Sequence, residues 1–467
     1  GSVKSVLQSQ FSKETAVFND FRITYNRQLG AHHLNAFAGF RLSSFNYNSS
    51  NILGYNNDQD KMPNMSMSQS YKQYGGQNDS WVNLAYYVNA DYNYQNKYFL
   101  TLTTTAESSS RFGKEANDGI KLAGVKWGLF PSVQLGWLMS SEKWFNVPAV
   151  NYLKLFAGYE ESGNDNVDYY AARTYFANAE FLQIATGLKL ANIENPKIQW
   201  ETTHRFNVGF QTALFNNRLS LGVDYYWSRT TNLLTRKAVS DITGLKYMWA
   251  NDGALRNWGI EGNMNVVLLN LRDWKWQAGF GIGHYQNKVT KLPATSDNFI
   301  TTYALDANGQ KDLASAKTIQ GYTSSVYGQN NILTAVGQAA GVFYGYQTAG
   351  VFASDADASQ AGKYGYLRYP TGLVSQPYRN FQAGDVHFVD QNGDGWINEA
   401  DMVKIGDPNP DIYGNFYTSL TWKGFTLAAD FKYSLGNDVF NYQRSQLEGA
   451  NGIYNQTTAV VNRWKYD

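Results

Sequence analysis

The chain has 467 residues, no cysteine and a formal net charge of +1 at neutral pH. Aromatic residues make up 16% of it, with 34 Tyr, 26 Phe and 13 Trp, which is typical of a β-rich protein with many amphipathic rings. The basic residues are scattered and the net charge is close to zero, so we expect no nucleic acid partner. The absence of cysteine excludes disulfides and thiolate metal sites.

Alternation of apolar and polar residues recurs along the whole chain and predicts twelve strands. In FTLAADFKY, for example, Phe425, Leu427, Ala429, Phe431 and Tyr433 fall on one face, opposite Thr426, Ala428, Asp430 and Lys432. In chain order, the predicted strands are 15–28, 32–46, 81–95, 98–107, 125–139, 151–160, 198–215, 218–229, 255–270, 274–290, 412–422 and 425–437.

The connections between these strands alternate between short and long. Tight turns are expected at 29–30, 95–97, 216–217, 271–273 and 423–424, with a moderate link at 140–150. The remaining connections are the long loops 47–80, 108–124, 161–197, 230–254 and 291–411. In an up-and-down sheet, this alternation puts all tight turns at one end and all long loops at the other.

This pattern indicates an all-β fold, a transmembrane antiparallel up-and-down β-barrel of an outer membrane, surrounded by lipid and with its long loops extracellular. No run of eighteen apolar residues is present, so no transmembrane helix is expected. The alternative folds are a soluble β-sandwich, whose strands average about five or six residues, and a propeller, which repeats at roughly 40 to 50 residues. The predicted strands are longer than sandwich strands, and no such repeat is visible.

Several phrases, spread from about Tyr98 to Asn441, also resemble a known family. They include YFLTLTTTAESSSRFG, WGLFPSVQLGWLMSSEKW, LKLFAGYEESGN, RNWGIEG, VFYGYQTAGVF and DQNGDGWINEADMVKIGDPNPDIYGNF. In this order they resemble the barrel of SusC/RagA-type TonB-dependent transporters of the Bacteroidota.

The resemblance implies a twenty-two-stranded barrel with an N-terminal plug domain and a TonB box. It also implies a SusD-like lipoprotein as partner and active import of a large nutrient, an oligosaccharide or a peptide, driven by the TonB complex. No plug-like segment is recognisable before Phe18. We therefore expect residues 1–467 to form a partial barrel, with the plug domain and the last strands outside this sequence.

Two other functions are compatible with the residue pattern. One is a passive porin or assembly-platform barrel, and the other is a secreted, calcium-containing, glycan-binding β-protein. An enzyme is not expected, because the sequence has no HExxH, GxSxG or P-loop motif.

The stretch DQNGDGWINEAD has the spacing of a calcium-binding loop. Its predicted oxygen ligands are Asp390, Asn392, Asp394, the Trp396 carbonyl, Asn398 and Asp401. Gly395 occupies the position that makes the sharp turn. The same residue types also form turns without any ion, but the number of matched positions favours a structural Ca²⁺ at the base of an extracellular loop.

Four tyrosines in two Tyr-Gly-Tyr runs are weak candidates for substrate binding. They are Tyr344, Tyr346, Tyr364 and Tyr366. Their rings could stack on sugars, although packing inside a large loop is the favoured role for such aromatic residues.

Overall fold

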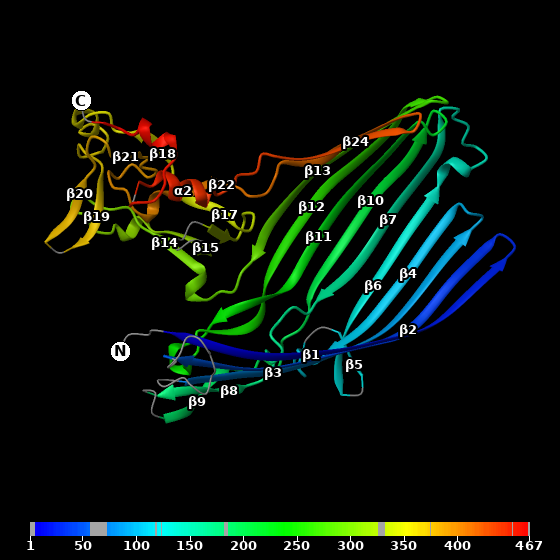
Figure 1. Cartoon of the computed structure of the whole chain (residues 1–467), viewed down its shortest axis with the longest axis horizontal. Helices are drawn as coiled ribbons and strands as arrows, with labels where there is room; N and C mark the ends of the chain where they lie inside the picture. The colour runs from blue at the N-terminus through cyan, green and yellow to red at the C-terminus, as the bar shows by residue number, and fades with distance from the viewer. Residues whose placement is uncertain are drawn as a thin grey trace. The chain divides into compact units, whose positions relative to one another are not determined.

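The structure is a computed structural model that describes residues 5–56, 72–116, 119–122, 124–181, 185–325, 332–373, 375–450 and 452–465. The chain divides into two compact units. The first consists of residues 1–148, 152–210 and 230–252, and the second of 149–151, 211–229 and 253–467. Figure 1 shows the strands and helices of both units.

Thirteen strands form the main sheet, and twelve of them follow one another in chain order. These twelve are β1 (Val6–Leu29), β2 (His32–Tyr55), β3 (Lys72–Tyr94), β4 (Tyr98–Ser109), β6 (Val125–Leu138), β7 (Val150–Asn164), β10 (Glu201–Leu214), β11 (Leu219–Ala238), β12 (Tyr247–Asn270), β13 (Trp274–Lys291), β23 (Ile412–Trp422) and β24 (Phe425–Leu435). The short strand β5 (Ile120–Leu122) pairs with β6 outside this path. All twelve predicted strands are confirmed, in the predicted up-and-down order.

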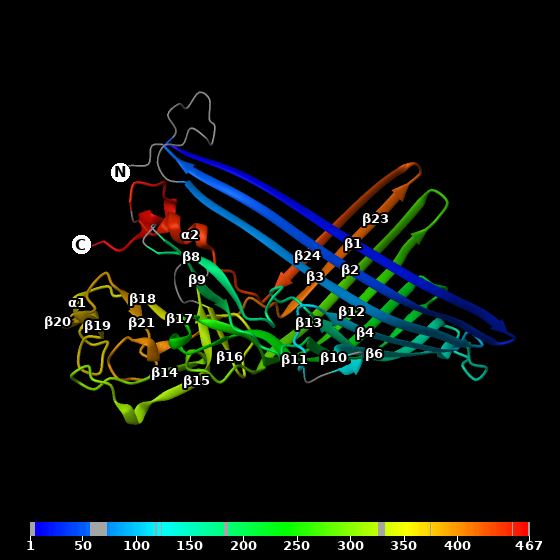
Figure 2. The ribbon, with the colours of Figure 1, turned by 90° about the horizontal axis from the view of Figure 1, so that it is seen from below.

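The tight turns between strands lie where the sequence predicted them. Gly30, Asn96, Asn217 and Lys423 all have positive φ angles of 50° to 63°. Glycine adopts this left-handed conformation without strain, and asparagine tolerates it better than most residues. In the second unit, the β23–β24 hairpin lies beside β13 in both views (Figure 2), with Trp422 opposite Phe425 at its turn.

Several strands, among them β1, β2, β3, β11 and β12, are longer than the sequence predicted. The predicted long loops are correspondingly shorter or contain strands. Predicted loop 47–80 is strand up to Tyr55 and again from Lys72, and residues 57–71 lie outside the described part. Predicted loop 230–254 shrinks to 239–246 between β11 and β12. The strand ends at 47–55 and 72–80 are rich in Asn, Ser, Gln and Gly, so they lack an apolar alternation, but backbone pairing does not require one.

Two other predicted loops contain structure of their own. Loop 161–197 contains the hairpin of β8 (Tyr175–Phe181) and β9 (Ala185–Asn192). Predicted loop 108–124 contains β5.

The connection from 292 to 411, here called the insertion, folds into small sheets. One has the order β14-β15-β16-β17-β22, and β18 pairs with β21 and β19 with β20. Their bounds are β14 Phe299–Thr302, β15 Lys317–Ser324, β16 Ile332–Ala335, β17 Val342–Tyr346, β18 Thr348–Val351, β19 Arg368–Leu373, β20 Gln376–Asn380, β21 Val386–Phe388 and β22 Met402–Gly406.

Among the described residues, helices are few and short. The α-helices there are α1 (Asp355–Ala358) in the insertion and α2 (Tyr442–Glu448) after the last strand, and 3-10 turns span 139–141, 241–243, 296–298, 313–315, 399–401 and 458–462. No helix in the described part of the chain is long and apolar enough to cross a membrane.

Two buried clusters form the core of the insertion. The first contains Phe352, Ala358, Leu367, Phe381 and Ile397. The second contains Leu333, Ala335, Val342 and Tyr344. The insertion is therefore a folded body with its own core, and the prediction of a single long loop was wrong in this respect.

Polar face, calcium-type loop and pocket

The strands β12, β13, β23 and β24 of the second unit have two chemically different faces. Opposed residues on one face are Met264, Phe280, Phe416 and Phe431, and the last three are 37%, 40% and 59% exposed. The next register positions on the other face are Asn263, Gly281, Asn415 and Lys432. The alternation predicted for 425–433 is thus confirmed, and its apolar side is exposed.

A column of glycines runs along the polar face of β13. Gly279 and Gly283 lie opposite Tyr417 and Tyr413 of β23, and a Cβ at either glycine would collide with the facing tyrosine ring. The rings lie across the glycines and reach β12, where the Tyr413 hydroxyl donates to Glu261 Oε1 at 2.6 Å. The Tyr417 hydroxyl donates likewise to Asn265 Oδ1 at 3.0 Å.

The first unit repeats this arrangement. Tyr87 of β3 lies across Gly39 of β2 and donates its hydroxyl to Asp20 of β1. Arg41 forms an ion pair with the same carboxylate at 3.3 Å. Sequence reasoning missed these three-strand bridges, although alternating glycines in GFGIG, Gly279–Gly283, were a visible signal.

Hydrogen bonds from backbone N–H groups of the predicted calcium loop to its own side chains hold the loop in its turn. Asp390 accepts hydrogen bonds from the N–H groups of Gly393 and Gly395 at 2.7 and 2.8 Å. Asn392 accepts from the Asp394 N–H at 2.9 Å, and Asp394 Oδ1 from the Trp396 N–H at 2.7 Å. The side chains therefore fix the turn at the spacing that the sequence indicated.

Asp401, at the twelfth position of the loop, is completely buried. Its two oxygens accept from the N–H groups of Gln391 at 2.9 Å and Asn398 at 2.8 Å. Burial raises the pKa of Asp401 to about 6, against the lowering effect of these hydrogen bonds, and the charges of Asp390 and Asp394 raise it further.

Within the described residues, no three Asp, Glu, His or Cys side chains are grouped so that they could hold a metal ion. Each carboxylate oxygen that accepts one N–H retains a second lone pair, so the donor chemistry suits Ca²⁺ although the grouping is absent. The predicted calcium site therefore stays a prediction, as does the alternative of an ion-free turn.

The loop also fastens distant parts of the insertion together. Asp394 Oδ2 accepts from the Leu305 N–H at 2.7 Å, and the indole of Trp396 donates to the Asp306 carbonyl at 2.9 Å. Trp396 is 1% exposed. Asp394 and Trp396 thus tie segment 304–306 to the loop.

The structure separates the four candidate tyrosines. Tyr344 belongs to the second core cluster, and Tyr366 packs against the first. Tyr364 is 41% exposed and lies near Lys363 and Arg368. Among these four, Tyr346 lines a pocket.

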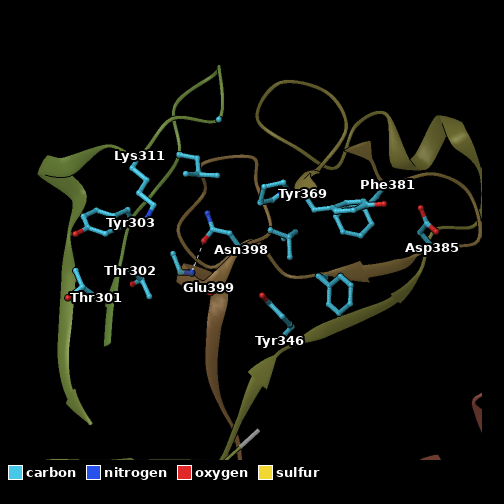
Figure 3. A pocket seen from close by; sticks show the side chains of 16 residues that line it. Thr301, Thr302, Tyr303, Lys311, Tyr346, Tyr369, Phe381, Asp385, Asn398 and Glu399 are labelled. Atoms are coloured by element: carbon cyan, nitrogen blue, oxygen red, sulfur yellow. Dashed lines mark hydrogen bonds between the residues drawn. The ribbon is translucent and has the colours of Figure 1, made fainter. Parts of the chain in front are cut away.

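This pocket has a volume of about 710 Å³ and lies beside the calcium-type loop (Figure 3). One wall carries Tyr303 and Lys311, and the opposite wall carries Tyr369 and Phe381. Residues 397–400, from the end of the loop, also line it. The volume is within the usual range for small-ligand sites of about 300–1,000 Å³.

Comparison with known proteins gives the family. Residues 4–369 match the family described as TonB dependent receptor-like, beta-barrel. The sequence is 28% identical over 468 residues to TonB-dependent receptor P3 of Formosa agariphila, covering 97% of this chain and 42% of the relative. It is 26% identical over 392 residues to TonB-dependent receptor SusC of Bacteroides thetaiotaomicron, covering 80% and 34%.

The fold is similar to that in the structure of the RagAB peptide transporter, with a TM-score of 0.73, 19% identity and coverage of 98% of this chain and 46% of that one. The family match over residues 4–369 makes the protein a β-barrel protein of the outer membrane. More particularly, the chain belongs to the TonB-dependent receptor family. It spans less than half the length of the relatives it matches. Those relatives are named as receptors, in agreement with the prediction that this protein is not an enzyme.

Proposed function

We propose that the whole protein actively imports a large nutrient across the outer membrane, driven by the TonB complex and assisted by a SusD-like surface lipoprotein. The observation that carries the proposal is the match of residues 4–369 to the TonB-dependent receptor barrel. The two-faced sheet supports it, because exposed apolar residues suit lipid whereas the opposite face offers hydroxyl, amide and carboxylate groups to a polar cargo.

The proposed cargo is an oligosaccharide or a peptide. The likeness of the fold to RagAB, which is itself a peptide transporter, supports the peptide. The oligosaccharide is supported by the resemblance of the sequence phrases to SusC/RagA-type transporters and by the similarity to SusC. The long loops are proposed to face the exterior, where they would meet both cargo and lipoprotein.

The alternative is a passive porin or assembly-platform barrel. Uptake of labelled oligosaccharide and peptide pools by cells that carry the full-length protein separates the two functions. Active import predicts that uptake stops when TonB is deleted or the proton gradient is collapsed. Uptake that continues unchanged under both conditions would instead support a porin. The secreted-protein alternative is overturned by the outer-membrane family.

For the loop Asp390–Asp401, the proposal includes a structural Ca²⁺ held by the six predicted positions. The local turn supports this, because Asp390, Asn392 and Asp394 each accept a backbone N–H of the loop and are thereby held within one turn. Extracellular calcium modules bind with Kd of roughly 10⁻⁴ to 10⁻³ M. The ion would accordingly stabilise the insertion and would not act as a signal.

A further inference from the structure

The pocket in the insertion combines an aromatic wall with polar groups that are not used by the fold. Its right-hand wall in Figure 3 is a chain of contacting rings. Tyr369 and Phe381 have their ring centroids 4.9 Å apart, and Phe388 is 5.8 Å from Phe381 and 5.5 Å from Tyr346. Phe381 is 8% exposed, so the hydrophobic core fixes this wall in place.

The opposite wall is also held in place. Tyr303 lies next to Ala304, whose N–H donates to Ser315 Oγ at 2.8 Å. The Lys311 ammonium lies 5.1 Å from the centre of the Tyr303 ring. A cation placed over a ring in this way is attracted by the ring's negative face. In Figure 3 the Lys311 ammonium lies on the inner side of the Tyr303 ring, whereas the Tyr303 hydroxyl points to the outer side of this wall.

Several polar groups that line the pocket have no partner among the described residues. They are the hydroxyls of Thr302, Tyr303, Tyr346 and Tyr369 and the carboxylate of Glu399. The Lys311 ammonium contacts the Tyr303 ring but forms no hydrogen bond with a described residue. Burial raises the pKa of Tyr346, and the charges of Glu399 and Asp401 raise it further. Lys311 and Glu399 are exposed and can bind water, whereas Thr302, Tyr346 and Tyr369 are half-buried. Both kinds of group are available to hydrogen-bond a polar ligand.

We infer that this pocket binds the end of a neutral saccharide chain. Sugar rings have apolar C–H faces that pack on aromatic rings and hydroxyls around their rim that both donate and accept, which matches an aromatic wall edged by hydroxyl, ammonium and carboxylate groups. Charges of both signs, on Lys311, Asp385 and Glu399, give no strong preference for an ionic ligand. The pocket lies within the insertion and is separate from the polar face of the sheet.

This inference deepens the proposed function and rests on it, because it assigns the oligosaccharide class of cargo to one site. Binding and transport are nevertheless separable. A protein that binds saccharide at this pocket but imports without TonB would contradict the proposed function and leave the pocket assignment intact.

The test uses the full-length protein in detergent, with saturation-transfer NMR followed by calorimetry. The probes are malto-, cello-, xylo- and mannohexaose, and a pool of random hexapeptides. We expect saturable binding of at least one hexaose and none of the peptide pool. Binding of no hexaose overturns the inference, and binding of peptides at this pocket overturns its ligand class.

Variants locate the binding site. Tyr346→Phe and Glu399→Gln preserve size and remove one polar function each, so each is expected to weaken binding by roughly two- to tenfold. In Figure 3 the Tyr346 hydroxyl points toward the space between the two walls. Tyr322→Phe is the matched control, because Tyr322 lies on β15 in the same sheet and does not line the pocket. Heat-modifiable gel mobility checks that each variant is folded. Equal affinity in the parent, Tyr346→Phe and Glu399→Gln proteins would place the saccharide elsewhere and overturn the inference.

Discussion

Asp394 has both carboxylate oxygens engaged by backbone N–H groups from different segments, Trp396 and Leu305. Replacing it with alanine would leave two N–H groups without acceptors, at a cost of about 1–3 kcal/mol each if they stay buried. That cost arises with or without an ion. Asp394→Asn is the better test of calcium, because it removes the charge and retains one of the two acceptor oxygens. The N–H group that then faces the amide nitrogen loses its acceptor in both conditions, so only the difference between Ca²⁺ and chelator reports on the ion.

If Ca²⁺ binds the loop, millimolar Ca²⁺ is expected to protect the insertion of the parent protein from protease, and Asp394→Asn is expected to lose most of this protection. The measurement compares limited proteolysis in Ca²⁺ with that in a chelator. Asp312→Asn is the matched control, since Asp312 also accepts a backbone N–H, from Ala314, at an exposed turn outside the loop. Equal proteolysis of the parent with and without Ca²⁺ would support the ion-free turn.

Asp401 predicts how pH changes the stability of the loop in the calcium-free protein: lowering the pH is expected to stabilise it. Its pKa in the folded loop is about 6, above the ordinary value of 3.8, so the folded loop binds the proton more tightly than the unfolded one. Stability contributed by this group is fully present below pH 3.8 and is lost as the pH rises through about 6.

In a chelator, the free energy of opening of the loop is therefore expected to increase, by on the order of 1–3 kcal/mol, between pH 7 and pH 4. Hydrogen exchange of the loop amides, corrected for the intrinsic effect of pH, measures this change. Asp401→Asn should abolish the dependence. In saturating Ca²⁺, protons would compete with the ion, and the loop should instead become less stable at low pH.

At the scale of elements, the tyrosine bridges connect three strands at a time. Tyr413 crosses Gly283 to reach Glu261, so the glycine is needed for space and the hydroxyl for the bond. We expect Tyr413→Phe to cost about 1 kcal/mol, the usual value of one hydrogen bond. Gly283→Ala should cost more, because its Cβ would displace the whole ring.

A double-mutant cycle tests this coupling through the heat-denaturation midpoint of the full-length protein. Once Gly283→Ala has displaced the ring, removing the hydroxyl should add little, so the two effects should not be additive. Gly262→Ala is the control, because a Cβ there meets Ile282 at 3.5 Å, an ordinary contact. Additive effects would show that Tyr413 and Gly283 act independently.

The elements were predictable where the chain alternates and turns tightly. All twelve strands and the turns at Gly30 and Asn217 follow from period-two patterning and from residues that tolerate positive φ. The strand ends were not predictable, because a segment such as Lys72–Ser80 is polar on both faces. Its backbone still pairs with β2, and this pairing leaves no mark in the side-chain pattern.

At the scale of the whole molecule, the insertion was the least predictable part. Its described strands are all three to eight residues long, too short for a periodic signal. Its cores join residues distant in sequence, such as Phe352 and Ile397. The pocket depends on the same long-range contacts. The calcium-type loop was recognisable because its residues are consecutive and their spacing is itself the signal.

The exposed apolar face of the sheet is expected to contact lipid and not water. Phe416 and Asn415 are neighbours on β23 that face opposite sides. If Phe416 faces lipid, Phe416→Arg should cost up to about 2–4 kcal/mol near the middle of the bilayer and should reduce the yield of folded full-length protein in the outer membrane. Asn415→Arg, on the polar face, should fold nearly as well as the parent. In water, by contrast, introducing a charge at a position that is 40% exposed usually changes the free energy of unfolding by no more than about 0.5 kcal/mol. Equal yields of the two variants would therefore mean that this face meets water, whereas a loss confined to Phe416→Arg is the result expected of a lipid-facing strand.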